Sequence, residues 1–324
     1  MSRKKDRRVT NMKYIARKAV AMLVTLLVIS VLAFLAFEVL PGDPTTKMLG
    51  TEWTAERADA LRTELGLNDP LPTRYFRWLG GFFGGDLGTS YGYGIPVSEL
   101  LAGKLGITLC LSLMAFLLVV IISVPFSLLM ARIEGTAAGG IFAGVTQVVM
   151  SIPPFFIGII FTSVFGLLLR LFVAGQFVPA SESFGGFLAY LFFPALSIAL
   201  PKSAMTVKLL RSSILEQLDE DYVRTAYSRG HSRRTALREH VLRNSIIPVV
   251  TFLAVTIADI VAGSIIVEQV FIVPGLGRLL LSSIANRDYP VVLSIIMIIA
   301  AIVVFVNFLA DVAYQRIDPR IRLK

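Results

Sequence analysis

Six long apolar runs constrain what this chain can fold into. A helix needs about 20 apolar residues to cross the hydrocarbon core of a bilayer. In lipid, only helices and closed barrels satisfy their own backbone hydrogen bonds. The runs therefore predict an all-α polytopic membrane protein with six transmembrane helices. They are Ala19–Phe37, Ile107–Ala131, Ile141–Leu169, Phe187–Leu210, Ile246–Val267 and Val291–Ala310.

Composition and local sequence refine this prediction. Only 16% of the residues are charged, whereas about 25% is usual in soluble domains. The first run is followed by Glu38-Val39-Leu40-Pro41, which is not the small-residue cleavage site of a signal peptide, so we expect this run to be retained. The third run is long, and Pro153-Pro154 within it predicts a break.

The distribution of Lys and Arg predicts the orientation. Of the 31 basic residues, eight lie in residues 1–18, nine in 202–245 and four after residue 311. Loops rich in Lys and Arg remain in the cytoplasm, so both termini and the large basic loop are predicted to be cytoplasmic. The predicted divisions are a cytoplasmic tail (1–18), a first transmembrane helix (19–41), an extracytoplasmic segment (42–106), a core transmembrane domain (107–314) with a cytoplasmic loop (212–245), and a cytoplasmic tail (315–324).

The predicted extracytoplasmic segment contains local structure. Thr54 can cap a short helix that ends before Gly66. An aromatic cluster follows between Tyr75 and Phe83. Aromatic rings are typical of the membrane–water interface, which is the favoured interpretation, and the alternative is that they form part of an external vestibule.

Motifs for catalysis, metal binding and nucleotide binding are missing from the sequence. The single cysteine, Cys110, excludes an internal disulfide, and the two histidines, His231 and His240, both lie in the cytoplasmic loop. A GxSxG string at 88–92 is predicted to lie outside, far from either histidine, and Gly103-Lys104 lacks the rest of a phosphate-binding loop. We therefore predict no catalytic residue, no metal site and no cofactor in this chain; ATP and Mg²⁺ would have to bind a partner.

A few polar side chains lie within or at the ends of the apolar runs. Asp259 is in the middle of the fifth run, and Gln147 lies in the third. Glu268 follows the end of the fifth run. Such groups are costly in lipid and usually face a cavity or a partner, so these three are candidates for lining a pathway or an interface.

The cytoplasmic loop has the pattern helix, break, helix. Ser213–Arg229 has helical spacing, Gly230 can end a helix in a left-handed conformation, and Ser232 can cap a second helix over Arg233–Arg243. Such an amphipathic hairpin suits the docking of a soluble partner. A surface helix held to anionic lipid by its arginines explains the periodicity equally well.

Two strings in this loop resemble the EAA loop of binding-protein-dependent ABC permeases. The wide spacing from Gly230 to Pro248 is similar to that of the peptide and nickel permeases, although Arg224 and Thr225 stand where the general motif has Glu and Ala. The strings are Tyr222-Val-Arg-Thr-Ala226-Tyr-Ser-Arg-Gly230 and His240-Val-Leu-Arg-Asn244-Ser-Ile-Ile-Pro248.

Further strings extend the resemblance over nearly the whole chain. The segment after the first run is similar to that of the B-type permease subunit, and one departure is Gly106, where the family often has Pro. The strings are Leu40-Pro41-Gly42-Asp43-Pro44, Leu65-Gly66-Leu67, Gly85-Asp86-Leu87-Gly88-Thr89-Ser90, Val267-Glu268, Pro274-Gly275-Leu276-Gly277-Arg278, Arg287-Asp288-Tyr289-Pro290 and Asp318-Pro319-Arg320-Ile321-Arg322.

The resemblance implies a type I ABC importer in a bacterial or archaeal cytoplasmic membrane. Two permease subunits, this one and a C-type companion, would enclose the path. Two ABC ATPases would bind beneath them, and an extracytoplasmic substrate-binding protein would deliver the substrate. The resemblance also implies a coupling helix that contacts the ATPase. The residues assigned to this contact are Tyr222, Arg224, Thr225, Ala226, Gly230, Arg233, His240 and Asn244.

The leading hypothesis for function is a permease of di- or oligopeptides. Import of a nickel chelate or another small solute is the alternative within the same family. A stand-alone secondary transporter would need inverted repeats or a coherent set of membrane charges, and the sequence has neither. An intramembrane enzyme would need a catalytic constellation that is missing.

Overall fold

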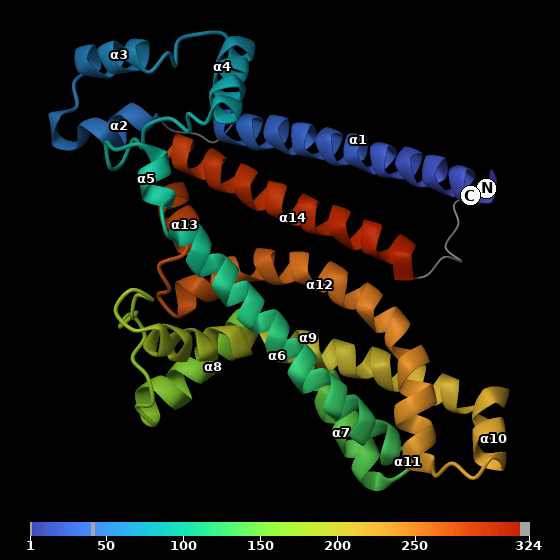
Figure 1. Ribbon diagram of the computed structural model, residues 1–324. Helices are drawn as coiled ribbons and strands as arrows, with labels where there is room; N and C mark the ends of the chain where they lie inside the picture. Colours follow the sequence, from blue (N-terminus) through green and yellow to red (C-terminus); the bar gives the residue numbers. More distant parts are fainter. Residues whose placement is uncertain (1, 40–42, 318–324) are drawn as a thin grey trace. The chain divides into compact units, whose positions relative to one another are not determined.

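The computed structural model describes residues 2–39 and 43–317, which form helices and connecting loops (Figure 1). Residues 40–42 and 318–324 lie outside the described part. Three predicted features therefore fall wholly or partly outside the described residues. They are the end of the predicted first transmembrane helix (19–41), most of the predicted tail (315–324) and the string Asp318–Arg322.

The chain divides into two compact units. The first comprises residues 1–108 and 274–308, and the second comprises 109–273 and 309–324. The first unit contains the helices α1 (Ser2–Val39), α2 (Pro44–Leu49), α3 (Ala55–Glu64), α4 (Leu71–Gly84), α5 (Val97–Leu101), α13 (Leu276–Asn286) and most of α14 (Tyr289–Ile317), with a 3₁₀ turn, η1, at Gly50–Glu52.

The second unit holds most of the remaining helices. α6 (Lys104–Arg132) begins in the first unit and continues in the second. The others are α7 (Ala137–Ser151), α8 (Pro154–Phe161), the π-helical turn η2 (Thr162–Leu168), α9 (Phe184–Leu218), α10 (Asp221–Ser228), α11 (Arg233–Ala236), the π-helical turn η3 (Leu237–Val241) and α12 (Leu242–Val270).

Five of the six predicted spans have a counterpart in a helical stretch that is long and apolar enough to cross a membrane. The third predicted run corresponds to a bent pair of helices, 137–151 with 154–168, which makes a sixth span if the pair crosses as one. The pair bends by 100° at Pro153-Pro154, as predicted. Pro cannot donate a backbone hydrogen bond and forces the preceding residue into an extended conformation, and Ile152 has an extended ψ of 126°.

The first unit has a small apolar core where α1, α4 and α14 meet. Ala33, Phe34 and Leu293 are buried there, and Tyr75 and Trp78 of α4 pack against them. The hydroxyl groups of Ser30 and Tyr75 are 2.8 Å apart and share a hydrogen bond. This contact fixes α4 against the C-terminal half of α1.

The core of the second unit is formed around α9 and α12. On α9, Ala195, Ser197 and Ala199 are buried; small residues allow membrane helices to approach closely. Further along, a buried apolar cluster joins the end of α6 to α9, α10, η3 and α12. Its members are Ala131, Leu210, Ile214, Val223, Leu237, Val241 and Val249.

Helix boundaries in the loop 212–245 differ from the prediction. A single helix over Ser213–Arg229 is wrong, because α9 continues to Leu218 and a break at 219–220 precedes α10. The predicted helix over Arg233–Arg243 does not end there either, since it continues through η3 into α12 and past Pro248. In membrane helices, neighbouring groups can compensate for the hydrogen bond that a proline removes.

Candidate functional site

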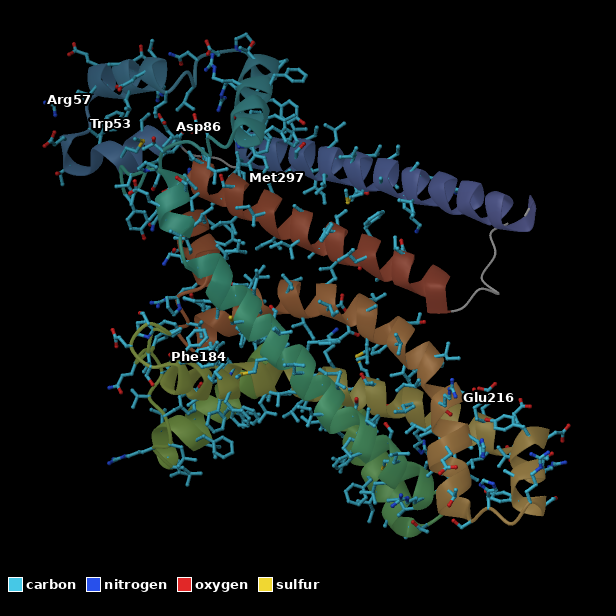
Figure 2. The ribbon with its side chains drawn as sticks, viewed as in Figure 1. Trp53, Arg57, Asp86, Phe184, Glu216 and Met297 are labelled. Atoms are coloured by element: carbon cyan, nitrogen blue, oxygen red, sulfur yellow. The ribbon has the colours of Figure 1, made fainter. Side chains whose placement is uncertain are left out.

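The helix α10 is amphipathic and stands at the end of α9. Val223 is fully buried and Ala226 is nearly so, and Val223 belongs to the apolar cluster with Leu210 and Ile214. Arg224 and Thr225 are exposed on the opposite face. Figure 1 shows α10 beside α11, and Figure 2 shows polar side chains around them, near Glu216 on the last turns of α9. Burial of one face therefore fixes the direction in which the other face points.

A Schellman motif ends α10 at Gly230. The N–H of Gly230 donates to Tyr227 O (2.9 Å), and the N–H of His231 donates to Ala226 O (3.2 Å). Gly230 has a φ of +84°, a left-handed conformation that a residue with a Cβ adopts only at a cost. The predicted helix end at this glycine is thus confirmed. No atom lies within 4 Å of a Cβ built there, so the conformation, not a collision, selects glycine.

The second arm of the loop begins at a capped helix. Ser232 Oγ accepts a hydrogen bond from Thr235 N (3.2 Å), as the sequence predicted. From there α11, η3 and α12 form one continuous helical arm. Arg233 is its first residue, His240 lies in the π-helical turn, and Asn244 is exposed on the first turn of α12.

The residues assigned to ATPase contact by resemblance do not share one surface. Arg224, Thr225, Gly230 and Asn244 are exposed. Tyr222 is half-buried and donates to Gln217 Oε1 (2.8 Å). Ala226 is buried inside the loop, so its small size serves the packing of α10 on its own chain.

Three charged side chains of α9 are paired with polar groups of neighbouring segments. Lys202 Nζ on α9 lies 2.8 Å from Asp259 Oδ2 on α12. Lys208 donates to Gln147 Oε1 of α7 (3.2 Å), and the guanidinium of Arg211 is bound to Glu134. The Asp259 side chain is 56% exposed. Glu268, in contrast, is fully buried near the end of α12 and does not reach a surface of the chain.

Two regions of this chain match one protein family. Residues 123–323 match the family described as "Binding-protein-dependent transport system inner membrane component". Residues 11–112 match the N-terminal region of such membrane components. The chain belongs to this family of transport system membrane components. Both the loop 212–245 and the charged pairs described above lie within the first match. Together with the long apolar helices, membership makes the chain an integral inner-membrane protein.

Curated members of the family resemble this chain along its length. The probable peptide ABC transporter permease y4tP of Sinorhizobium fredii is 33% identical over 95% of this chain and 99% of its own. The oligopeptide transport system permease AppB of Bacillus subtilis is 35% identical over 95% and 98%. A putative peptide permease of Brucella ovis is 35% identical over 96% and 99%.

A solved structure shows the same fold. A crystal structure of an amino acid ABC transporter with histidines matches with a TM-score of 0.53 and 18% identity, over 68% of this chain and 94% of that one. At this identity the likeness concerns the fold alone. It agrees with the predicted transmembrane domain of a type I importer.

The N-terminal region of this family member is held by buried polar contacts that the sequence did not predict. The carboxylate of Asp288, 1% exposed, accepts hydrogen bonds from the Ser90 hydroxyl, Tyr91 N (3.0 Å) and Gly92 N (3.1 Å). These donors belong to the GxSxG string, which is therefore a structural turn. Ser90 and Asp288 are 198 residues apart in the sequence. The presence of both family strings, 88–92 and 287–290, is the one sequence signal that could have suggested a contact between them.

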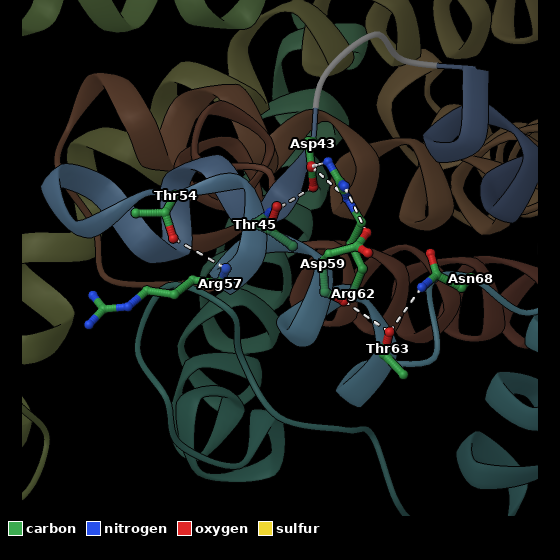
Figure 3. A network of polar contacts seen from close by, with 8 residues as sticks. All are labelled: Asp43, Thr45, Thr54, Arg57, Asp59, Arg62, Thr63 and Asn68. Atoms are coloured by element: carbon green, nitrogen blue, oxygen red, sulfur yellow. Dashed lines mark hydrogen bonds and ion pairs between the residues drawn. The ribbon is translucent and has the colours of Figure 1, made fainter.

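A second polar network joins α2 to α3 (Figure 3). Asp43 caps α2 by accepting from Thr45 N (2.9 Å) and is bound to the guanidinium of Arg62. Burial acts to raise the pKa of Asp43, but the hydrogen bonds from Thr45 and Arg62 prevail and hold that pKa below its ordinary value. Thr54 accepts from Arg57 N (3.2 Å) at the start of α3, and this confirms the predicted cap.

The predicted aromatic cluster divides into two groups. Tyr75 and Trp78 pack on Phe34, with ring centroids 5.4 and 6.0 Å away. Phe34 and Trp78 also line a pocket of about 400 Å³, beside the ion pair of Glu38 and Arg74 (2.5 Å). Phe76 and Phe83 are 68% and 77% exposed, as rings at a membrane interface would be. The cluster therefore has a packed part and an exposed part.

Proposed function

We propose that this chain is one permease subunit of an ATP-driven importer of di- and oligopeptides. It would form half of the path beside a C-type permease subunit, and an extracytoplasmic binding protein would deliver the peptide. Two separate ABC ATPases would bind ATP and Mg²⁺, so this chain would be non-catalytic and hold no cofactor. Family membership supports the role of a membrane subunit, and the names of three similar relatives support peptides over the alternative of a nickel chelate or another small solute.

The inner loop is the proposed site of contact with the ATPases. The observation that carries this role is the geometry of α10: a buried face fixes it to α9, while Arg224, Thr225 and the turn at Gly230 stay exposed. A helix held in this way can transmit a push from a soluble subunit to the spans as a rigid body. We accordingly propose that residues 212–245 and both termini lie on the cytoplasmic side, and that residues 42–106 lie outside.

Lys202 and Asp259 are proposed to face the path or the companion subunit. Charges within spans are costly in lipid and face a cavity or a partner. The half-exposed carboxylate of Asp259 agrees with that placement, and Gln147 with Lys208 forms a similar exposed pair. We favour the path, because a peptide carries one positive and one negative terminus, each of which has a complementary group in the Lys202–Asp259 pair.

Reconstitution tests the function. The chain is assembled with its companion permease, ATPases and binding protein in liposomes, and ATP hydrolysis is measured with peptide and with a nickel chelate. We expect stimulation by peptide and none by the chelate. The reverse result would select the alternative substrate and leave family membership intact.

A glycine variant tests the coupling role in the same assay. A β-branched side chain at a positive φ costs about 1–2 kcal/mol, so Gly230→Val should lower peptide-stimulated hydrolysis by about tenfold without reducing membrane insertion. Gly106→Ala is the matched control, since Gly106 lies in the helix α6 with no atom within 4 Å of a new Cβ. Equal activity of the Gly230→Val variant and the wild type would remove the coupling role.

A further inference from the structure

Three side chains with metal-binding groups meet at the turn of the inner loop. His231, Glu239 and His240 each offer one ligand atom, and these atoms all lie within 4.8 Å of one another. The two imidazole rings have centroids 5.3 Å apart and are inclined by 60°. The sequence predicted no metal site, because His231 stands eight residues before Glu239, at a spacing that matches no familiar zinc motif.

The fold of the loop explains why these residues converge. The Schellman turn at Gly230 reverses the chain and leaves His231 at the start of the second arm. Glu239 and His240 are neighbours in the π-helical turn η3. Neighbouring side chains of an α-helix point about 100° apart, and the wider π-helical turn, with more residues per turn, reduces that angle. Both side chains can therefore face His231. Single π-helical turns are rare in proteins overall, and those that occur are often found at functional sites.

His231 also carries a buried nitrogen whose bonding capacity is not used. Its Nδ1 atom has no hydrogen-bond partner among the described residues and is shielded from solvent. Buried polar atoms nearly always have a partner. A neutral imidazole nitrogen is a good metal ligand, so His231 has bonding capacity that its contacts within the chain do not use.

We propose that His231, Glu239 and His240 form a zinc-binding site in the inner loop. Two imidazoles and one carboxylate are a ligand set that Zn²⁺ uses with a fourth position open to water. Mg²⁺ and Ca²⁺ prefer oxygen ligands. Zinc–nitrogen bonds of about 2.0–2.1 Å hold two ligand atoms no more than about 4.2 Å apart. A cluster whose ligand atoms lie within 4.8 Å of one another needs at most small rotations of the three side chains to bind the ion.

The surrounding charge also favours zinc over hard cations. Residues 229–243 contain five arginines and a single acidic residue, Glu239. A cation that binds chiefly through charge is repelled from such a basic segment. Zinc bound by two neutral imidazoles depends less on the electrostatic field of these arginines, and the carboxylate of Glu239 offsets part of the positive charge.

The ion would join the two sides of α11. His231 precedes this helix and Glu239 and His240 follow it, so the metal would cross-link the turn at Gly230 to the arm that continues into α12. The site stands on the geometry of this chain alone and does not depend on the proposed transport of peptides.

Zinc titration tests the proposal directly. The full-length chain, purified without a polyhistidine tag and placed in lipid nanodiscs, is titrated with Zn²⁺ against a chromophoric chelator. We expect one zinc per chain. His231→Leu and Glu239→Gln should each weaken binding by at least about tenfold, since even loss of a supporting group around a metal costs about 10–100-fold. Glu220→Gln, an exposed acid of the same loop outside the trio, is the control and should bind as the wild type does.

Cobalt provides a second readout. Co²⁺ in place of zinc should give the intense visible absorption of a four-coordinate site in the wild type and the control, and this absorption should be lost in both variants. Glu239 is exposed and Gln has the same shape, so this variant decides the matter if His231→Leu does not fold. Equal zinc affinity in all four proteins, or no zinc bound by the wild type, would overturn the proposal.

Discussion

The proposed outer segment, residues 42–106, and the proposed inner loop, residues 212–245, hold their structure by different means. In the outer segment the polar groups bind one another: Asp288 accepts from three donors of the 88–92 turn, and Asp43 binds Arg62. In the inner loop, apolar packing of Val223 and Leu237 holds the helices, and polar side chains such as Arg224 point outward, with 76% of that side chain exposed.

This difference indicates where a charged partner can dock. Hydrogen bonds and ion pairs used inside a unit are not available to another protein. An amphipathic helix with a buried apolar face keeps its polar face available. The inner loop therefore leaves more polar side chains available to a charged partner than the outer segment does.

The largest expected difference is in accessibility to a labelling reagent, because we propose that the two regions lie on opposite sides of the membrane. In a Cys110→Ser background, cysteines placed at Ser181 and Ser232, which are both exposed, are treated on intact cells with a reagent that cannot cross the membrane. We expect labelling at Ser181 and none at Ser232. Permeabilised cells serve as the control, in which both should react. Labelling of Ser232 from outside would contradict the proposed orientation.

Removal of the buried acceptor should disrupt the outer turn. Asp288→Ala leaves the Ser90 hydroxyl and the N–H groups of Tyr91 and Gly92 without their acceptor, at about 1–3 kcal/mol for each unsatisfied buried donor. We expect a loss of about 3 kcal/mol or more, measured as faster hydrogen exchange in residues 88–97. Asp86→Ala is the control, since Asp86 is exposed and accepts only from Gly88 N among the described contacts. Equal exchange in both variants would refute a structural role for Asp288.

Loss of apolar volume should weaken the inner loop. Val223→Ala removes two fully buried methyl groups from the cluster at α10, at a cost of about 1.5–2 kcal/mol. Hydrogen exchange of residues 221–230 should quicken accordingly. Thr225→Ala on the exposed face should change the stability by less than about 0.5 kcal/mol. If Thr225→Ala had the larger effect, polar contacts rather than packing would hold this helix.

The ion pair of Asp43 and Arg62 should give the smallest effect, and one that depends on pH. Because the pKa of folded Asp43 lies below its ordinary value of 3.8, the pair stabilises the fold above pH 3.8. That stabilisation is lost as the pH falls through the lowered pKa. Arg62→Gln should therefore be slightly less stable than the wild type at pH 7.

The two proteins should become equally stable in acid. Thermal unfolding in detergent between pH 7 and pH 2 measures the difference. Arg57→Gln is the control, because Arg57 pairs with Glu52 and does not contact Asp43 in the described structure. A difference between the Arg62→Gln variant and the wild type that stayed constant over this range would rule out Asp43 as the titrating partner.

Much of the fold could be predicted from the sequence, because its signals are local. An apolar run of bilayer length can satisfy its backbone only as a helix, so each of the six runs predicted a span. Pro153-Pro154 predicted the bend, Gly230 the helix end, and Thr54 and Ser232 the caps, since each depends on the backbone preferences of one or two residues. The family resemblance similarly came from strings that could be recognised in order.

Tertiary structure decided which residues meet, because contacts between distant segments leave no local pattern. Asp288 joins the 88–92 turn, and Lys202 joins Asp259, only after helices have packed. Ala226 was predicted to face a partner, yet burial of α10 turns it inward. The length of α9 beyond Ser213 and the π-helical turn at Leu237–Val241 were likewise set by packing in the apolar cluster. That turn also brings His231, Glu239 and His240 together, through a rotation that residue order alone does not encode.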